Sequence, residues 1–128
     1  MWVAEWPVLA AGAAPHQPAA VFHANRVVAR THAAAHAGVA NGTRRRAAQR
    51  LCPELEVLAH DPAADARRFE PVVRAVAEVA PRLELVEPGW LCLAARGPAR
   101  YFGGEPAIAA RLVGTVTGLL GEPAVGMV

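Results

Sequence analysis

Apolar and polar residues follow strand-like and helix-like periods in turn, and this pattern predicts an α+β fold. Residues 2–10 are largely apolar and are predicted to form a short buried strand that ends near Pro7. A loop rich in Gly, Ala and Pro follows over residues 11–18. Residues 21–29 mix Val, Phe and Ala with polar residues, which predicts either a strand or a strand and a turn.

Two short helices are expected next. Alanine dominates residues 31–37, which predicts a helix with Thr31 as its N-cap and Gly38 as its stop. Thr43 is expected to cap a second helix over residues 44–52, which ends at a proline. An edge strand over residues 55–59 is predicted to follow.

The second half of the chain alternates long helices with strands. Apolar residues recur at helical spacing over residues 67–80, which predicts an amphipathic helix. Two strand-like runs, 83–87 and 90–93, are separated by Pro-Gly and are expected to form a hairpin. A further amphipathic helix is predicted over residues 107–120, and a strand is expected to begin within 124–128.

This order of elements predicts a split βαβ, ferredoxin-like arrangement, with a small helical lobe inserted after the first strand. The expected organisation is a first strand within residues 1–10, an inserted lobe over 11–66, and the rest of the sheet domain over 67–128. All three parts belong to one domain, which we expect to be incomplete.

Composition and charge add limited information about function. The 128 residues are 54% hydrophobic and carry a formal net charge of +2, values typical of a globular domain with a sizeable core. All thirteen basic residues are arginines, but eleven acidic residues nearly balance them, so any contact with DNA must be local. Cys52 and Cys92 lack metal-ligand spacing, and no run of apolar residues is long enough to span a membrane. We therefore expect a reduced, cytoplasmic protein without membrane contact.

The most specific motif lies in the predicted lobe. Ala37–Gly42, followed by Ala47–Leu55 with its Leu-Cys-Pro-x-Leu run, resembles the fingers region of Y-family (UmuC/DinB-type) DNA polymerases. The resemblance extends in the family's order through Phe69–Pro81, Glu84–Leu93 and Ala99–Gly103. It implies a Y-family palm with a small fingers lobe inserted after its first strand.

The resemblance also shows where this chain departs from the family. The family palm holds two magnesium ions on carboxylates of the first strand and of an Asp-Glu pair in the hairpin, because phosphoryl transfer requires both metals. Here Val3 stands at the leading carboxylate position, Gly89 and Trp90 stand at the pair, and Glu5 is the remaining carboxylate near a metal position. The resemblance therefore implies lost catalytic and metal-binding residues, no bound cofactor and no polymerase activity.

A second departure concerns the incoming nucleotide. The Tyr and Arg that clamp the triphosphate in family members correspond to His32 and Ala35.

The chain is most similar to the catalytically inactive ImuB group of the bacterial mutasome. This likeness implies an adaptor in DNA damage tolerance, translesion synthesis and induced mutagenesis. Its implied partners, through regions outside this chain, are the sliding clamp, a RecA-like accessory protein and an error-prone replicative-type polymerase.

Other candidate residues follow from the sequence itself. Arg44, Arg45, Arg46 and Arg50 form the densest basic cluster and are candidate DNA contacts, although such a run is more often a solvated face. His32 and His36 have helical spacing but no third metal ligand. The three tryptophans are expected to lie in the core, with Trp90 filling the former metal pocket.

Three functions thus stay open. The first is the adaptor without catalysis, and the second is an active error-prone polymerase of the same family. The third is a DNA-binding or protein-interaction module without a link to mutagenesis.

Overall fold

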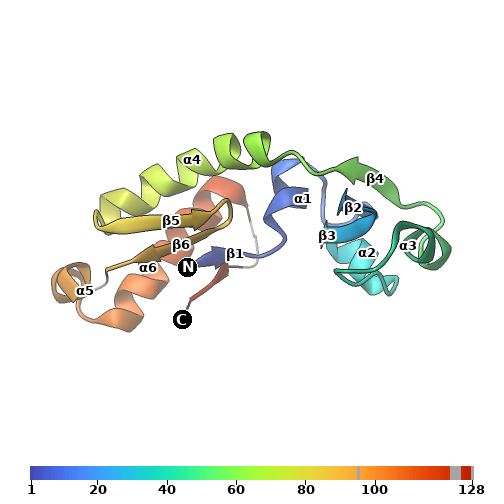
Figure 1. Ribbon diagram of the computed structural model, residues 1–128. Coiled ribbons are helices and arrows are strands. Elements are labelled where there is room, and N and C mark those ends of the chain that lie inside the picture. The colour runs from blue at the N-terminus through green and yellow to red at the C-terminus, as the bar shows by residue number, and fades with distance from the viewer. Residues whose placement is uncertain (95, 122–124, 128) are drawn as a thin grey trace. The chain divides into compact units, whose positions relative to one another are not determined.

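The computed structural model describes residues 1–94, 96–121 and 125–127, and the described chain divides into two compact units. The split unit combines residues 1–4 with 66–128, and the inserted unit comprises residues 5–65. Figure 1 shows the elements of both units in chain order. The inserted unit begins before residue 11, the expected start of the lobe. Naming the two units palm and fingers stays a prediction.

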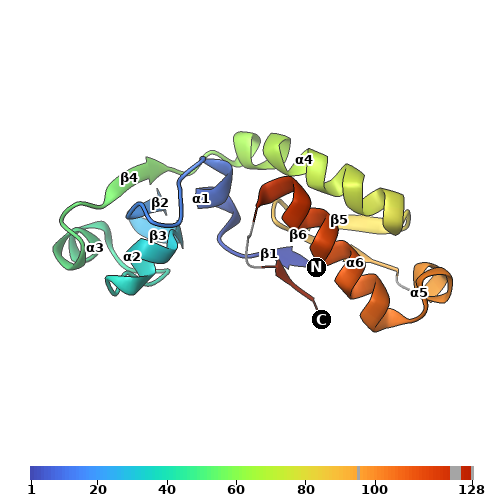
Figure 2. The same cartoon turned by 180° about the vertical axis from the view of Figure 1, so that it is seen from behind.

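A four-stranded sheet with order β5-β6-β1-β7 organises the split unit. Its strands are β1 (Trp2–Val3), β5 (Leu83–Glu87), β6 (Trp90–Leu93) and β7 (Val125–Gly126). Helix α4 (Pro62–Val79) begins in the inserted unit and continues from residue 66 in the split unit, which also contains α5 (Arg96–Phe102) and α6 (Glu105–Leu120). Helices α4 and α6 lie on the same side of the sheet, whose other side is open in the front view (Figures 1 and 2). The core between helices and sheet contains Val3, Phe69, Val72, Val76, Leu91, Ile108, Leu112 and Val116.

The hairpin predicted at residues 83–87 and 90–93 is confirmed. Strands β5 and β6 pair antiparallel, with Leu83 opposite Leu93 and Glu84 opposite Cys92. Gly89 has φ 93 in the turn, a conformation that glycine adopts without steric cost. The register shifts between Leu85 and Glu87.

The strand predicted over residues 2–10 is wrong in its extent. Strand β1 covers only Trp2–Val3, and helix α1 covers Trp6–Ala10. Pro7 lies in the first turn of this helix, where the missing N–H costs nothing and the fixed φ favours a helix start. Glu5 turns the chain with a left-handed φ of 56. The proline thus starts a helix here instead of ending a strand.

The inserted unit is mixed rather than helical, because it contains a three-stranded sheet with order β3-β2-β4. Strands β2 (Ala19–His23) and β3 (Arg26–Arg30) form an antiparallel hairpin. Of the two alternatives predicted for residues 21–29, the structure agrees with a strand and a turn. Strand β4 (Glu56–Ala59) pairs parallel to β2 at the sheet edge, which confirms the predicted edge strand. Helices α2 (His32–His36) and α3 (Arg45–Leu51) complete the unit with α1.

The three-stranded sheet buries apolar side chains on both faces. One cluster packs Phe22 and Val27 with α2, α3 and the segment after them; it comprises Ala20, Phe22, Val27, Ala34, Val39, Ala48, Cys52 and Leu55. The other cluster joins Val8 of α1 to Ala19, Val21 and Ala29. Alternate residues of β2 thus enter opposite clusters, as the two-residue period of a strand requires.

The helix starts show which capping predictions hold. Thr31 caps α2, because its Oγ1 accepts a hydrogen bond from the Ala34 N–H at 3.3 Å. Thr43 was wrongly expected to cap α3. The N-cap is Arg44, without a side-chain hydrogen bond, and the Thr43 hydroxyl instead accepts from the Ala40 N–H.

Helices α4 and α6 begin earlier than residues 67 and 107, where they were expected. Asp61 Oδ1 accepts from the Ala64 N–H at 3.1 Å, and a proline follows directly, so this Asp-Pro pair starts the helix. In α6 a proline also occupies the first turn. Strand β7 lies within the expected 124–128, of which residues 124 and 128 are outside the described residues.

Candidate functional site: the open sheet face and an arginine cluster

The positions expected to have lost their carboxylates meet where β1 lies beside β6. The Val3 N–H donates to the Gly89 carbonyl at 2.7 Å. One step along, Met1 and Leu91 exchange two hydrogen bonds of 2.8 and 2.9 Å. Trp2 and Trp90 face each other between these bonded pairs, so they form a non-hydrogen-bonded pair whose Cβ atoms are about 4.5–5.5 Å apart.

Neighbouring residues of these strands point to opposite faces of the sheet. Val3 is 4% exposed and Leu91 is fully buried, so both belong to the helix-covered face. Trp2 is 39% exposed and Trp90 is 45% exposed, and by alternation they lie on the open face. The expectation that Trp2 and Trp90 are core residues is therefore wrong, because none of the described helices covers their side of the sheet. Trp90 does not fill a sealed pocket, whereas Trp6 is buried as expected.

Sequence reasoning missed Trp2 as the partner of Trp90. The available signal was the shared order of residues, in which a tryptophan precedes an aliphatic residue at both Trp2–Val3 and Trp90–Leu91. The Trp2 indole also lies against the backbone of Gly126 on β7, so closely that a Cβ at that position would overlap the ring. Gly126 therefore provides the space in which the Trp2 ring rests.

Oxygen ligands are scarce at this meeting point. Val3, Gly89 and Trp90 offer no side-chain oxygen, so these residues do not form the ligand set that Mg²⁺ requires. Within residues 1–94, 96–121 and 125–127, no group of three or more His, Cys, Asp or Glu side chains is arranged to hold a metal ion.

Glu5, the remaining carboxylate near a predicted metal position, is bound within the inserted unit. Its Oε2 accepts a hydrogen bond from the Arg30 backbone N–H at 2.8 Å. Its Oε1 accepts from the Asn41 side chain at 3.3 Å. Both carboxylate oxygens thus have partners within the inserted unit, and these bonds fix the turn before α1.

The predicted nucleotide positions lie in the inserted unit. His32 and Ala35 belong to α2, where His32 is exposed and Ala35 is half-buried. His36 is exposed on the same helix. Ala35 has no polar side chain, so His32 is the one member of this pair whose side chain can donate to a phosphate.

The arginine cluster, defined as Arg44, Arg45, Arg46 and Arg50, lies on and just before α3. All four side chains are exposed, and the first turn of α3 carries no acidic residue. The hairpin between β2 and β3 adds Arg26, which pairs with Arg44 across an isolated bridge and donates from Nη1 to the Gly42 carbonyl at 2.9 Å. The structure therefore gathers five arginines where the sequence showed four, because the added one is distant along the chain.

A second group that the sequence did not reveal lies where β2 and β4 end. His60 Nε2 is 3.2 Å from Asp65 Oδ2, and the His60 ring packs edge-on against His23 with centroids 5.6 Å apart. The Trp6 indole N–H donates to the Asp65 carbonyl at 3.0 Å. These contacts join the first residues of α4, which belong to the inserted unit, to that unit's sheet.

The two cysteines differ in environment, and both are free thiols. Cys52 is buried in the inserted unit's core, and this burial, together with Glu54, raises the pKa of its thiol. Cys92 is exposed on β6.

Among the described helices, none combines the length and hydropathy needed to cross a bilayer.

The sequence matches the impB/mucB/samB family over residues 9–126. This match covers most of the chain, which therefore belongs to that family. A comparison with curated protein sequences finds no significant match.

Solved Y-family DNA polymerases share the fold. A Dbh–Dpo4 polymerase chimera superposes with a TM-score of 0.74 at 11% identity, over 91% of this chain and 38% of the polymerase. A Dbh ternary complex superposes with a TM-score of 0.71 at 13% identity, over 93% of this chain and 34% of the other. The chain thus has a Y-family polymerase-like α+β fold and spans little more than a third of these polymerases.

Proposed function

We propose that this chain is a polymerase-like module that acts in DNA damage tolerance as an adaptor and does not catalyse nucleotide transfer. The observation that carries the proposal is the meeting point of β1 and the β5–β6 turn, where Val3, Gly89 and Trp90 contribute no oxygen ligand. Phosphoryl transfer depends on metal ions that neutralise developing charge. A site without ligands for these ions cannot supply that stabilisation.

The position of Glu5 supports the proposal. Its carboxylate accepts hydrogen bonds from the Arg30 N–H and the Asn41 side chain, and a charged acceptor makes such bonds worth roughly 1.5–3 kcal/mol each. Binding a cation elsewhere would require these bonds to break. Glu87 is exposed opposite Trp90, and one such carboxylate binds Mg²⁺ weakly.

The likeness to the ImuB group gives the adaptor its proposed context. In this context the whole protein contributes to translesion synthesis and induced mutagenesis. Its partners are the sliding clamp, a RecA-like accessory protein and an error-prone replicative-type polymerase. These contacts involve parts of the protein outside the 128 residues, while the polymerase-like module supplies a scaffold.

Two measurements on the full chain test the absence of catalysis. The first is primer extension on a templated duplex with Mg²⁺ or Mn²⁺, with an active Y-family polymerase as positive control. The second is Mn²⁺ binding followed by electron paramagnetic resonance of the free ion. We expect no extension and no saturable loss of the free-ion signal. Primer extension that requires the added metal would overturn the proposal in favour of an active error-prone polymerase.

A second candidate function, local DNA binding, is favoured by the arginine cluster joined by Arg26. Neutralising each phosphate contributes about 0.9 to the slope of log binding constant against log salt concentration. Replacing residues 44–46 by Gln should therefore lower that slope by as much as about 3 and weaken binding to any sequence. The matched control replaces three exposed arginines of the split unit, Arg67, Arg74 and Arg82. An equal loss in both variants would show that net charge, and not the cluster, binds DNA.

A further inference from the structure

The open face of the four-stranded sheet carries an ordered row of side chains across its strands. Trp90 is opposite Glu87 on one side and opposite Trp2 on the other, and Trp2 is opposite Gly126. Directly opposed residues of antiparallel strands point to the same face. Val86 is the one extra residue that the register shift between Leu85 and Glu87 inserts into β5.

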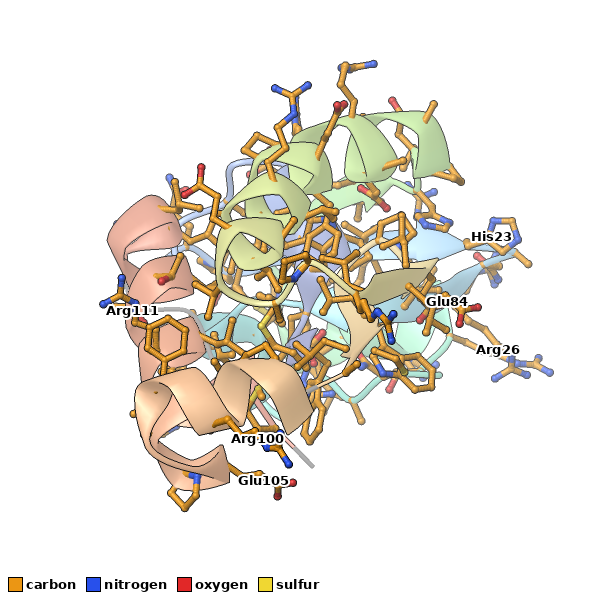
Figure 3. All side chains as sticks on the ribbon, turned by 90° about the vertical axis from the view of Figure 1, so that its left-hand side faces the viewer. His23, Arg26, Glu84, Arg100, Glu105 and Arg111 are labelled. Carbon is orange, nitrogen blue, oxygen red and sulfur yellow. The ribbon has the colours of Figure 1, made fainter. Side chains whose placement is uncertain are left out.

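A second row lies beside the first. Glu84 is opposite Cys92, which lies two residues from Trp90 and hence on the same face. Figure 3 shows the Glu84 side chain on the side of β5 that faces away from α6. Both Glu84 and Cys92 are exposed. The open face therefore presents two indoles bordered by two carboxylates.

This face concentrates exposed apolar area. Among the described residues, seven large hydrophobic side chains are exposed, and Trp2 and Trp90 are the largest of them. Both lie on this face, where β1 runs beside β6. Exposed apolar residues that gather on one surface, unlike singly scattered ones, are typical of an interaction site.

The Trp2 indole and the backbone at Trp90 are held in place before any partner arrives. Trp2 rests on Gly126, where a larger residue would displace the ring. Trp90 directly follows Gly89, which is buried in the β5–β6 turn. The Gly89 carbonyl accepts a hydrogen bond from the Val3 N–H. Because the Trp2 ring and the backbone at Trp90 are already fixed, less conformational entropy is lost when a partner binds.

The charge on this face selects the partner. Glu84 and Glu87 border the indoles. The nearest basic residue in the sheet register is Arg82, which lies two residues before Glu84 and thus farther from Trp90. Carboxylates repel the phosphates of nucleic acid, which disfavours a strand of DNA stacked on the indoles. A cation gains from both neighbours, because indole faces attract cations and carboxylates pair with them.

We propose that the open face formed by Trp2, Trp90, Glu84 and Glu87 binds an arginine-bearing peptide segment of a partner protein. The guanidinium groups lie on the indole faces and pair with the bordering carboxylates. This inference rests on the proposed adaptor function, since a face that held a nucleotide and its metals would not be free for a peptide. It identifies the kind of partner segment that the module recognises.

Fluorescence anisotropy with the full chain and a labelled Gly-Arg-Gly-Arg-Gly-Arg-Gly peptide tests the proposal. Arginines at alternate positions point to one side of an extended peptide. The matched probe carries citrulline in place of arginine, which keeps the shape and removes the charge. We expect binding of the arginine peptide that weakens with salt, and binding of the citrulline peptide at least about 10-fold weaker, given the strength of desolvated charge pairs and cation–π contacts.

Variants and an internal control locate the binding. Trp90→Ala should weaken binding by about 2- to 30-fold, the range expected for one cation–π contact, and Trp90→Phe by less. Joint Glu84→Gln and Glu87→Gln changes should reduce the salt dependence, whereas Glu70→Gln and Glu78→Gln on α4 should not. In ¹⁵N-resolved NMR spectra, the indole N–H signals of Trp2 and Trp90 should shift, while that of buried Trp6 stays constant.

Three results would overturn the proposal. Equal binding of both peptides would exclude cation recognition. Shifts of the same indole signals by oligo-dT, but not by the arginine peptide, would assign the face to nucleobase stacking. Concentration-dependent self-association lost with Trp90→Ala would assign it to a second copy of the chain. Each result is independent of primer extension, so a failure of peptide binding is distinguishable from a failure of the proposed adaptor function.

Discussion

The Thr31 hydroxyl joins three segments of the inserted unit, so its removal should destabilise this unit strongly. Thr31 is 4% exposed. Its Oγ1 donates to the Gln17 carbonyl at 2.6 Å and accepts from the N–H groups of Ala19 at 3.0 Å and Ala34 at 3.3 Å. A loop, strand β2 and helix α2 thus share one oxygen atom.

The expected cost follows from these bonds. Thr31→Val keeps the side-chain shape but removes the N-cap, which costs about 1 kcal/mol. It also leaves the N–H of fully buried Ala19 unpaired, at a cost of about 1–3 kcal/mol. The sum is about 2–4 kcal/mol of unfolding free energy. Thr31→Ser keeps the hydroxyl and loses one buried methyl group, so it should cost about 1 kcal/mol.

Urea unfolding measured through Trp6 provides the assay. Trp6 is buried in the inserted unit, and the other two tryptophans, Trp2 and Trp90, belong to the split unit and can be replaced by Phe. In that background the emission change reports the inserted unit alone. The reasoning is refuted if Val and Ser variants lose equal stability, or if the Val variant loses less than about 1 kcal/mol, the lower bound set by the cap alone.

Three further predictions concern other positions. Gly126→Ala should displace the Trp2 indole, seen as a shift of its NMR signal and a lower melting temperature; an unchanged signal would contradict the overlap. Cys52 should react with a thiol reagent far more slowly than Cys92, and equal reactivity would contradict its burial. Because burial raises the pKa of the Cys52 thiol, the contribution of this thiol to stability should be present below about pH 9 and decline above it. Pro71→Ala, at an exposed position inside α4, should raise the unfolding free energy by about 2 kcal/mol by restoring an N–H donor, and a loss in urea unfolding would contradict it.

Elements with a strong local signal could be predicted from the sequence. The hairpin at residues 83–93 and the capped helix after Thr31 were found because turn and capping residues stand beside clear apolar patterns. Pro7 was misread because a proline after an apolar run ends a strand or starts a helix with equal local justification. The choice depends on the left-handed turn at Glu5, which is held by hydrogen bonds to residues far along the chain.

The candidate sites show the same division. The arginines of α3 were visible because they are consecutive, whereas Arg26 joined them only through the pairing of its strand. The exposed position of Trp2 and Trp90 could not be deduced from composition, because large aromatic residues are usually buried. It depends on which face of the sheet the helices cover, and that is set by the topology of the whole split unit.

The hydrogen bond between Trp6 and the Asp65 carbonyl has a consequence for the order of folding. It joins the first and last segments of the inserted unit, through which the chain leaves and re-enters the split unit. Closing an unstructured loop of this length would cost more entropy than closing a short one. Once the inserted unit has folded, its two ends are already held together. Strand β1 and helix α4 then meet as if joined by a short connection, so the inserted unit assists the assembly of the sheet that it interrupts.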